Sequence, residues 1–92
     1  MVNAIVLLEI EKSLINTVAE RLVDIKGVSE VYSVAGDYDL VAVVRTKNND
    51  ELAEVVTNQI LKSEGIFDSK TLIAFRVFSK YELEKIFSVG ME

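Results

Sequence analysis

The chain has 92 residues, of which 50% are hydrophobic, and its 15 acidic and 10 basic side chains give a net charge of -5. A single domain of this size buries only about 60–65% of the surface of its unfolded chain, so this much apolar material predicts self-association. The acidic balance argues against direct nucleic-acid binding. Because histidine and cysteine are absent, thiol or imidazole metal ligands and Ser-His or Cys-His nucleophile pairs are excluded. We expect no metal site, no cofactor and no catalytic residue.

The first predicted element is a β-strand over residues 2–10. Its middle is apolar on both alternating faces, which is typical of a strand at the centre of a sheet. The apolar run over residues 4–8 is too short to cross a membrane, and it lacks the basic lead-in and the cleavage site of a signal peptide. We therefore expect a cytoplasmic protein without a membrane partner.

A helix is predicted over residues 13–25, because apolar side chains recur there at helical spacing. Gly27 is expected to end it with a positive φ. Two strands follow, over residues 28–35 and 38–45, in which β-branched or aromatic residues alternate with others. The residues between them, Gly36-Asp37, predict a tight antiparallel hairpin turn.

A second helix is predicted after a cap at Asn48 or Asn49, with Glu51 in the capping-box position. Gly65 is expected to end this helix, and residues 69–80 are predicted to form the last strand. The inner stripe of the helix comprises Leu52, Val55, Val56, Gln59 and Ile60.

Residues 1–80 thus have the predicted order β-α-β-β-α-β. This order indicates an α+β, ferredoxin-like domain with both helices on one face of a four-stranded antiparallel sheet. Residues 81–92 add a short C-terminal helix and tail to the same domain. The helices can cover one face only, yet the strands are apolar on both. We therefore expect two copies to pack sheet to sheet, as a dimeric α+β barrel.

The turn from Gly36 to Asp39 is the most informative segment for function. Glycine lets a ligand approach the backbone amides, which can bind an anion, while the carboxylates of Asp37 and Asp39 can accept hydrogen bonds from an ammonium group. An amino acid carries both charges. The alternative is that these residues serve turn chemistry and that the carboxylates are merely solvated.

Ser69 and Thr71 lie two residues apart on the last predicted strand and so share one face. Two hydroxyl groups at this spacing can bind a carboxylate or an amino group. The alternative is that they are ordinary residues of an edge strand. The residues alone leave both alternatives open, for this pair as for the turn.

Taken together, these two segments resemble a known family. Residues 28–41, VSEVYSVAGDYDLV, and residues 65–71, GIFDSKT, resemble the effector-binding (RAM) domain of the Lrp/AsnC transcription regulators. The resemblance spans nearly the whole chain and includes the order of the elements. It implies a ferredoxin-like domain that dimerises through its sheets, assembles further into tetramers or octamers, and binds a small amino acid where dimers meet.

The resemblance also implies which residues bind the ligand. The matching positions are Gly36, Asp37, Tyr38 and Asp39 in the loop, and Ser69 and Thr71 as the paired hydroxyl residues, where Ser69 replaces the more usual threonine. Full-length members begin with a helix-turn-helix domain, whereas this chain begins at its first strand. It therefore resembles the stand-alone RAM-domain proteins, and direct contact with DNA is not expected.

We expect an amino-acid-binding oligomeric module that is not an enzyme and that acts as a sensor or as a modulator of a full-length Lrp/AsnC regulator. Two alternatives stay open. A small dimeric α+β-barrel enzyme would use Tyr32 and Asn3, which are the polar groups on otherwise apolar strands. A ligand-independent partner would assemble with full-length regulators and would need no amino acid.

Overall fold

The structure, a computed structural model, describes residues 1–78 and 80. Within these residues, the strands form one antiparallel sheet in the order β2-β3-β1-β4, which confirms the ferredoxin-like α+β fold. The elements are β1 (Val2–Ile10), the 3-10 turn η1 (Lys12–Leu14), α1 (Ile15–Val23), β2 (Val28–Ser33), β3 (Leu40–Thr46), α2 (Asn49–Ala53), the π-helical segment η2 (Glu54–Ile60) and β4 (Ile66–Ile73).

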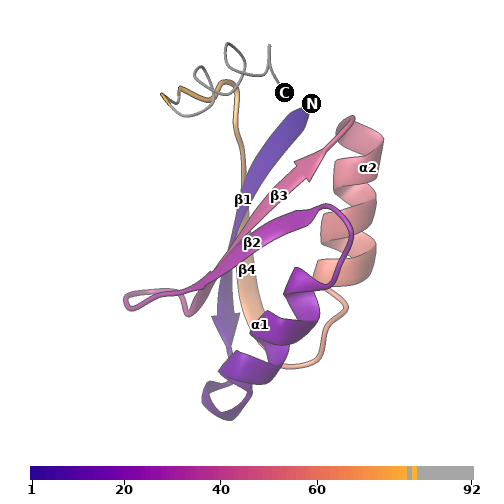
Figure 1. Cartoon of the computed structure of the whole chain (residues 1–92). Coiled ribbons are helices and arrows are strands. Elements are labelled where there is room, and N and C mark those ends of the chain that lie inside the picture. Colours follow the sequence, from indigo (N-terminus) through magenta and orange to yellow (C-terminus); the bar gives the residue numbers. More distant parts are fainter. Residues whose placement is uncertain (79, 81–92) are drawn as a thin grey trace.

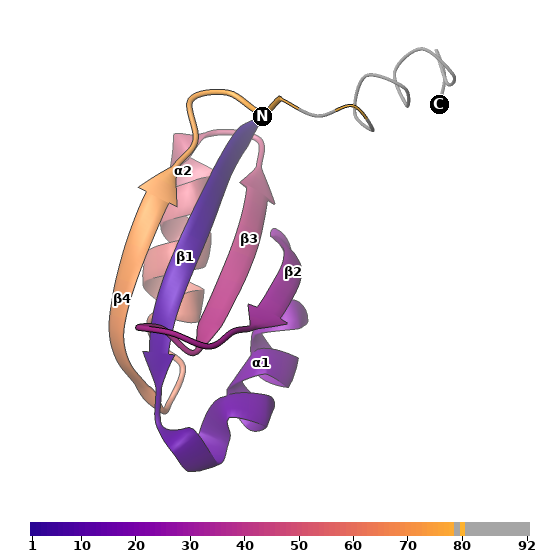
Figure 2. The same cartoon turned by 90° about the vertical axis from the view of Figure 1, so that its left-hand side faces the viewer.

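Both helices cover one face of the sheet, as predicted, and the opposite face is open (Figure 1). Figure 2 looks onto this open face, with α1 and α2 behind the strands. Every second residue of β1, from Ala4 to Ile10, is buried beneath the helices, whereas Ile5 and Glu9 on the open face are exposed. The core comprises Ala4, Val6, Leu8, Ile10, Val18, Leu22, Val28, Leu40, Ala42, Val44, Leu52, Val55, Val56 and Ile60.

The predicted tight turn between β2 and β3 is wrong. β2 ends at Ser33 and β3 begins at Leu40, so residues 34–39 form a longer loop. A type I′ turn needs a positive φ at both central residues, and here Gly36 has a φ of 134° while Asp37 does not have a positive φ. The loop is closed instead by a hydrogen bond of 3.0 Å from the Val34 amide to the Asp39 carbonyl. It projects from the sheet on the side away from the helices (Figure 1).

The second helix begins as predicted and then departs from the prediction. The Asn48 side chain accepts a hydrogen bond of 2.8 Å from the Glu51 amide, so Asn48 is the N-cap. After Ala53 the helix widens into η2, in which turns are closed by i→i+5 hydrogen bonds. The wider turn changes which side chains face the sheet. Gln59, which was predicted for the inner stripe, is exposed, whereas Leu52, Val55, Val56 and Ile60 are buried.

The last strand has different bounds from those predicted. β4 starts at Ile66, because the Gly65 carbonyl already accepts a hydrogen bond of 2.8 Å from the Glu11 amide. It ends at Ile73, which pairs with Ala4, because β1 has almost no residues left beyond that point to act as a partner. The short helix predicted over residues 81–92 lies outside the described residues.

Candidate functional site

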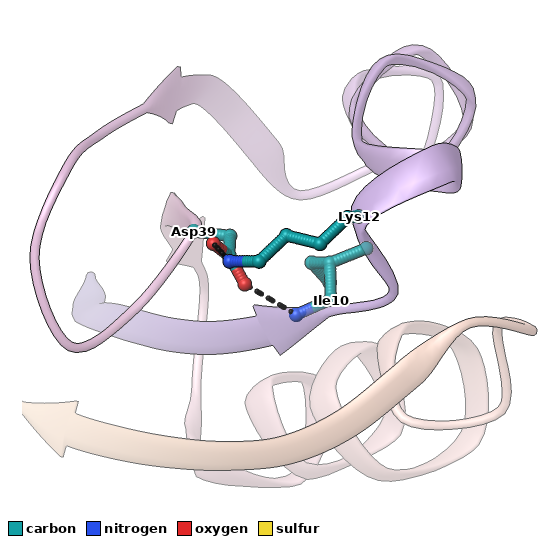
Figure 3. Close-up of polar contacts among 3 residues, drawn as sticks. All are labelled: Ile10, Lys12 and Asp39. Carbon is teal, nitrogen blue, oxygen red and sulfur yellow. Dashed lines mark hydrogen bonds and ion pairs between the residues drawn. The ribbon is translucent and has the colours of Figure 1, made fainter.

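Asp39 fixes the base of the loop between β2 and β3. Its carboxylate accepts a hydrogen bond of 2.8 Å from the Ile10 amide and lies 3.1 Å from Lys12 Nζ (Figure 3). The last residue pair between β1 and β3 is Leu8 with Leu40, and Ile10 lies beyond it. The Asp39 carboxylate therefore accepts the hydrogen bond that a backbone carbonyl of β3 would otherwise accept from Ile10. The Asp39 amide also donates to the Leu8 carbonyl at 2.8 Å. These bonds tie the loop to the end of β1.

The same contacts determine the charge of this carboxyl group. The hydrogen bond from the Ile10 amide, and after it the hydrogen bond and charge of Lys12, lower the pKa of Asp39 below its ordinary value. The Lys12 side chain is 85% exposed, so water and salt screen the ion pair. The backbone hydrogen bond is therefore the dominant contact, and it requires an acceptor at this position.

The tip of the loop differs from its base. Gly36 and Asp37 are exposed, and Tyr38 is half-buried. A Cβ atom added to Gly36 would have no neighbour within 4 Å, so the space around this backbone is open to a ligand. Asp37 forms no ion pair with any described residue. Of the two loop aspartates, Asp37 is thus the one with a carboxylate available to an ammonium group.

Ser69 and Thr71 lie on β4 and face the helices. Ser69 pairs with Leu8 and Thr71 with Val6, both of which are buried on the helix side of β1. Thr71 is exposed and, with Ile73, lines a hollow of about 210 Å³ between β4 and the second helix. The remaining lining residues are Asn49, Leu52, Ala53, Val56 and Thr57. Asn49 was considered only as a possible helix cap, and nothing in the sequence pointed to Thr57, because polar residues on a helix are most often solvated.

One chain does not bring all the predicted residues together. Leu8 of β1 pairs with Leu40 of β3 on one side and with Ser69 of β4 on the other. Strand β1 therefore lies between the loop and the hydroxyl pair, which are separated by two strand spacings, or about 10 Å. The loop also projects from the open face (Figure 2), whereas the hydroxyl groups lie on the helix side. Within one chain, Asp37 and Thr71 therefore do not line one small pocket.

The residues of the enzyme alternative do lie together. Asn3 and Tyr32 line a second hollow of about 260 Å³ on the open face, with Glu30 and Arg45. The hydrogen bond from Tyr32 to Glu30, and then the charge of Glu30, raise the pKa of the Tyr32 phenol.

Residues 1–78 and 80 contain neither a candidate metal site nor a membrane-spanning helix. No group of three or more acidic, histidine or cysteine side chains in this part of the chain could hold a metal ion. None of the described helices is long and apolar enough to cross a membrane.

Replacement of Asp39 by alanine is expected to lower the Tm clearly, because the buried Ile10 amide loses its acceptor. The matched control is Asp37→Ala in the same loop, which removes an exposed carboxylate and is expected to leave the Tm almost unchanged. Thermal unfolding followed by circular dichroism, at one protein concentration, compares the two variants. Equal Tm values would show that Asp39 does not anchor the loop.

The lowered pKa of Asp39 also predicts a pH dependence. A carboxyl group whose pKa is lower in the folded state than in the unfolded state stabilises the folded state. This contribution is complete above the pKa of the unfolded state, about 3.9, and is lost as the pH falls through the pKa of the folded state. The difference in unfolding free energy between wild type and Asp39→Asn should therefore be constant between about pH 7 and 5 and shrink below about pH 4. Urea unfolding at a series of pH values measures it. A difference that persists undiminished in acid would contradict this assignment.

Comparison with known proteins identifies the family. The family model of the Lrp/AsnC ligand binding domain matches residues 3–83. The HTH-type transcriptional regulator FL11 of Pyrococcus furiosus is 34% identical over 74 residues, which are 80% of this chain and 48% of FL11. The FL11 protein of Pyrococcus abyssi is 41% identical over 73 residues, again 48% of its length. The chain thus spans about half the length of these curated relatives, which are HTH-type transcriptional regulators.

One solved structure is similar to this chain over the whole length of the solved chain. TTHA0845 from Thermus thermophilus is 42% identical, with a TM-score of 0.81, and the match covers 87% of this chain and 100% of that chain. The residues matched by the family model, 3–83, include nearly all of the ferredoxin-like sheet and its two helices. The chain therefore belongs to the Lrp/AsnC family, as a ligand-binding domain of the type found in these transcription regulators.

Proposed function

We propose that this chain forms an oligomeric module that binds a small amino acid and alters the assembly of Lrp/AsnC regulators, without catalysing a reaction. The observation that carries this proposal is the match of residues 3–83 to a ligand-binding domain. The net charge of -5 supports a role without direct DNA contact, because DNA binding depends on neutralising phosphate charge. Such a module would act in the cytoplasm, alongside the regulators.

The chemistry of the two candidate surfaces suits an amino acid. The open backbone at Gly36 can receive a carboxylate, and the exposed carboxylate of Asp37 can bind an ammonium group. The hollow beside Thr71 is mainly apolar and can hold a side chain. At about 210 Å³ it is smaller than the roughly 300–1,000 Å³ typical of sites for drug-sized ligands. A small ligand shared between copies fits these dimensions.

Two successive contacts between copies would complete the site. The open sheet face is apolar at its centre, which favours a first, sheet-to-sheet contact. This contact would leave the helix side of β4, with Ser69 and Thr71, accessible to the loop of another dimer. Within this arrangement we assign Gly36, Asp37 and Tyr38 to ligand contact in the loop, and Asp39 to positioning that loop.

Isothermal titration calorimetry with the twenty common amino acids tests the proposal. At least one amino acid should bind, and Asp37→Asn and Thr71→Val should each weaken it by roughly 10- to 100-fold, the effect expected for the loss of a hydrogen bond to a charged group. Glu20→Gln on the exposed side of α1 is the control and should bind like wild type.

Either of two results would contradict the proposal. Absence of binding across the whole panel would favour the ligand-independent partner, whose test is capture of a full-length regulator without any amino acid. Binding that neither variant weakens would move the site away from the loop and β4.

A further inference from the structure

The helices cover the middle of the sheet but leave its β4 edge partly uncovered. Ile73 of β4 pairs with Ala4 of β1, so both side chains lie on the helix side of the sheet. Ala4 is fully buried, whereas Ile73 is 58% exposed. β4 is the outermost strand on its side of the sheet, with α2 behind it (Figure 2). The uncovered space over Ile73 is the hollow of about 210 Å³ that Thr71 also lines.

The second helix contributes two rows of side chains to this hollow. Leu52 and Val56 are buried, and Ala53 and Thr57 are exposed. The members of each row are four residues apart, a spacing that places two side chains on the same side of a helix. Ala53 has the smallest side chain of the four. A larger side chain at position 53 would therefore occupy part of the hollow.

The lining of the hollow carries no charge. Most of it is formed by apolar side chains, and its polar groups are the amide of Asn49 and the hydroxyl groups of Thr57 and Thr71. None of the described residues that line it could neutralise a charged side chain of a ligand. Because a charge that leaves water without a partner is strongly destabilised, the hollow favours uncharged side chains.

The volume of the hollow limits the size of the side chain that it can hold. A dry apolar cavity of about 150 Å³ holds a molecule of the size of benzene, and this hollow has about 210 Å³. It therefore has room for the side chain of leucine, methionine or phenylalanine. The methyl group of alanine would bury much less apolar surface there, and burial of apolar surface is the attraction that such a hollow offers.

We propose that this hollow holds the side chain of the bound amino acid and selects uncharged, apolar side chains of the size of leucine, methionine or phenylalanine. Ala53 sets the upper limit of size through its small volume, and so determines specificity without forming a hydrogen bond. This inference rests on the proposed function, because the charged groups of the same ligand would be bound by the loop of another copy.

Calorimetric titration of the full chain with alanine, leucine, methionine, lysine and glutamate tests the proposal. Wild type should bind leucine or methionine at least roughly 10-fold more tightly than alanine, because a single methylene group in a hydrophobic pocket changes discrimination by about 10- to 200-fold. Lysine and glutamate should bind more weakly than leucine, since the lining offers no partner for their side-chain charges.

Two variants separate the hollow from the rest of the site. Ala53→Leu should weaken the binding of leucine and methionine by roughly 10-fold or more, because its side chain occupies the hollow, and should change the affinity for alanine much less. Thr57→Glu adds a carboxylate to the lining and should shift the preference from leucine towards lysine. The control is Thr17→Leu, which adds a leucine at an exposed position of α1 and should bind each amino acid like wild type.

The outcomes distinguish this inference from the proposed function. Leucine binding that Asp37→Asn weakens, but that Ala53→Leu and Thr57→Glu leave unchanged, would overturn the assignment of the hollow and leave the proposed function intact. A wild type that prefers alanine, lysine or glutamate to leucine and methionine would overturn the assignment as well. So would equal losses for alanine and leucine in Ala53→Leu, in a protein that is folded by circular dichroism. Binding of none of the twenty common amino acids would instead contradict the proposed function itself.

Discussion

The structure depends on one constraint, which is that two helices can cover only one face of a four-stranded sheet. Because successive side chains of a strand point to opposite faces, the same strands supply both the buried core and the open surface. Leu8 and Ile10 stabilise the domain under the helices, while Ile5, between Ala4 and Val6 on β1, is 40% exposed on the other side. An apolar surface of this kind explains why the domain is expected to function as an assembly.

In the site that we propose, the loop between β2 and β3 depends on one residue for its position and on another for binding. Asp37 and Asp39 are two residues apart and chemically identical, but Asp39 is held by the Ile10 amide and Lys12, whereas Asp37 is exposed. The first holds the loop against the sheet, and the second is available for binding. A substitution at either position would therefore weaken binding in our account, for different physical reasons.

The sequence was sufficient for features that depend on local pattern. Apolar residues on both faces identified β1 as central, and Asn48 and Glu51 marked the start of α2. Gly27 has a positive φ, as predicted, of 103°. Features that depend on distant partners were missed or misplaced. The anchoring of Asp39 involves Ile10, 29 residues away, and the end of β4 depends on where β1 begins. The residue patterns of the separate segments also did not indicate that the loop and the hydroxyl pair lie on opposite sides of the sheet.

The most direct test of the account is whether one ligand site is built from two copies. Asp37→Asn removes the loop half of the site and Thr71→Val removes the β4 half, so mixed oligomers, formed by unfolding and refolding the two variants together, should regain intact sites. Random mixing predicts recovery of about one site in four for a site shared between symmetric copies, measured by calorimetry with the amino acid that wild type binds. If the mixture regained no binding while wild type treated in the same way did, both halves would belong to a single chain and the account would be wrong.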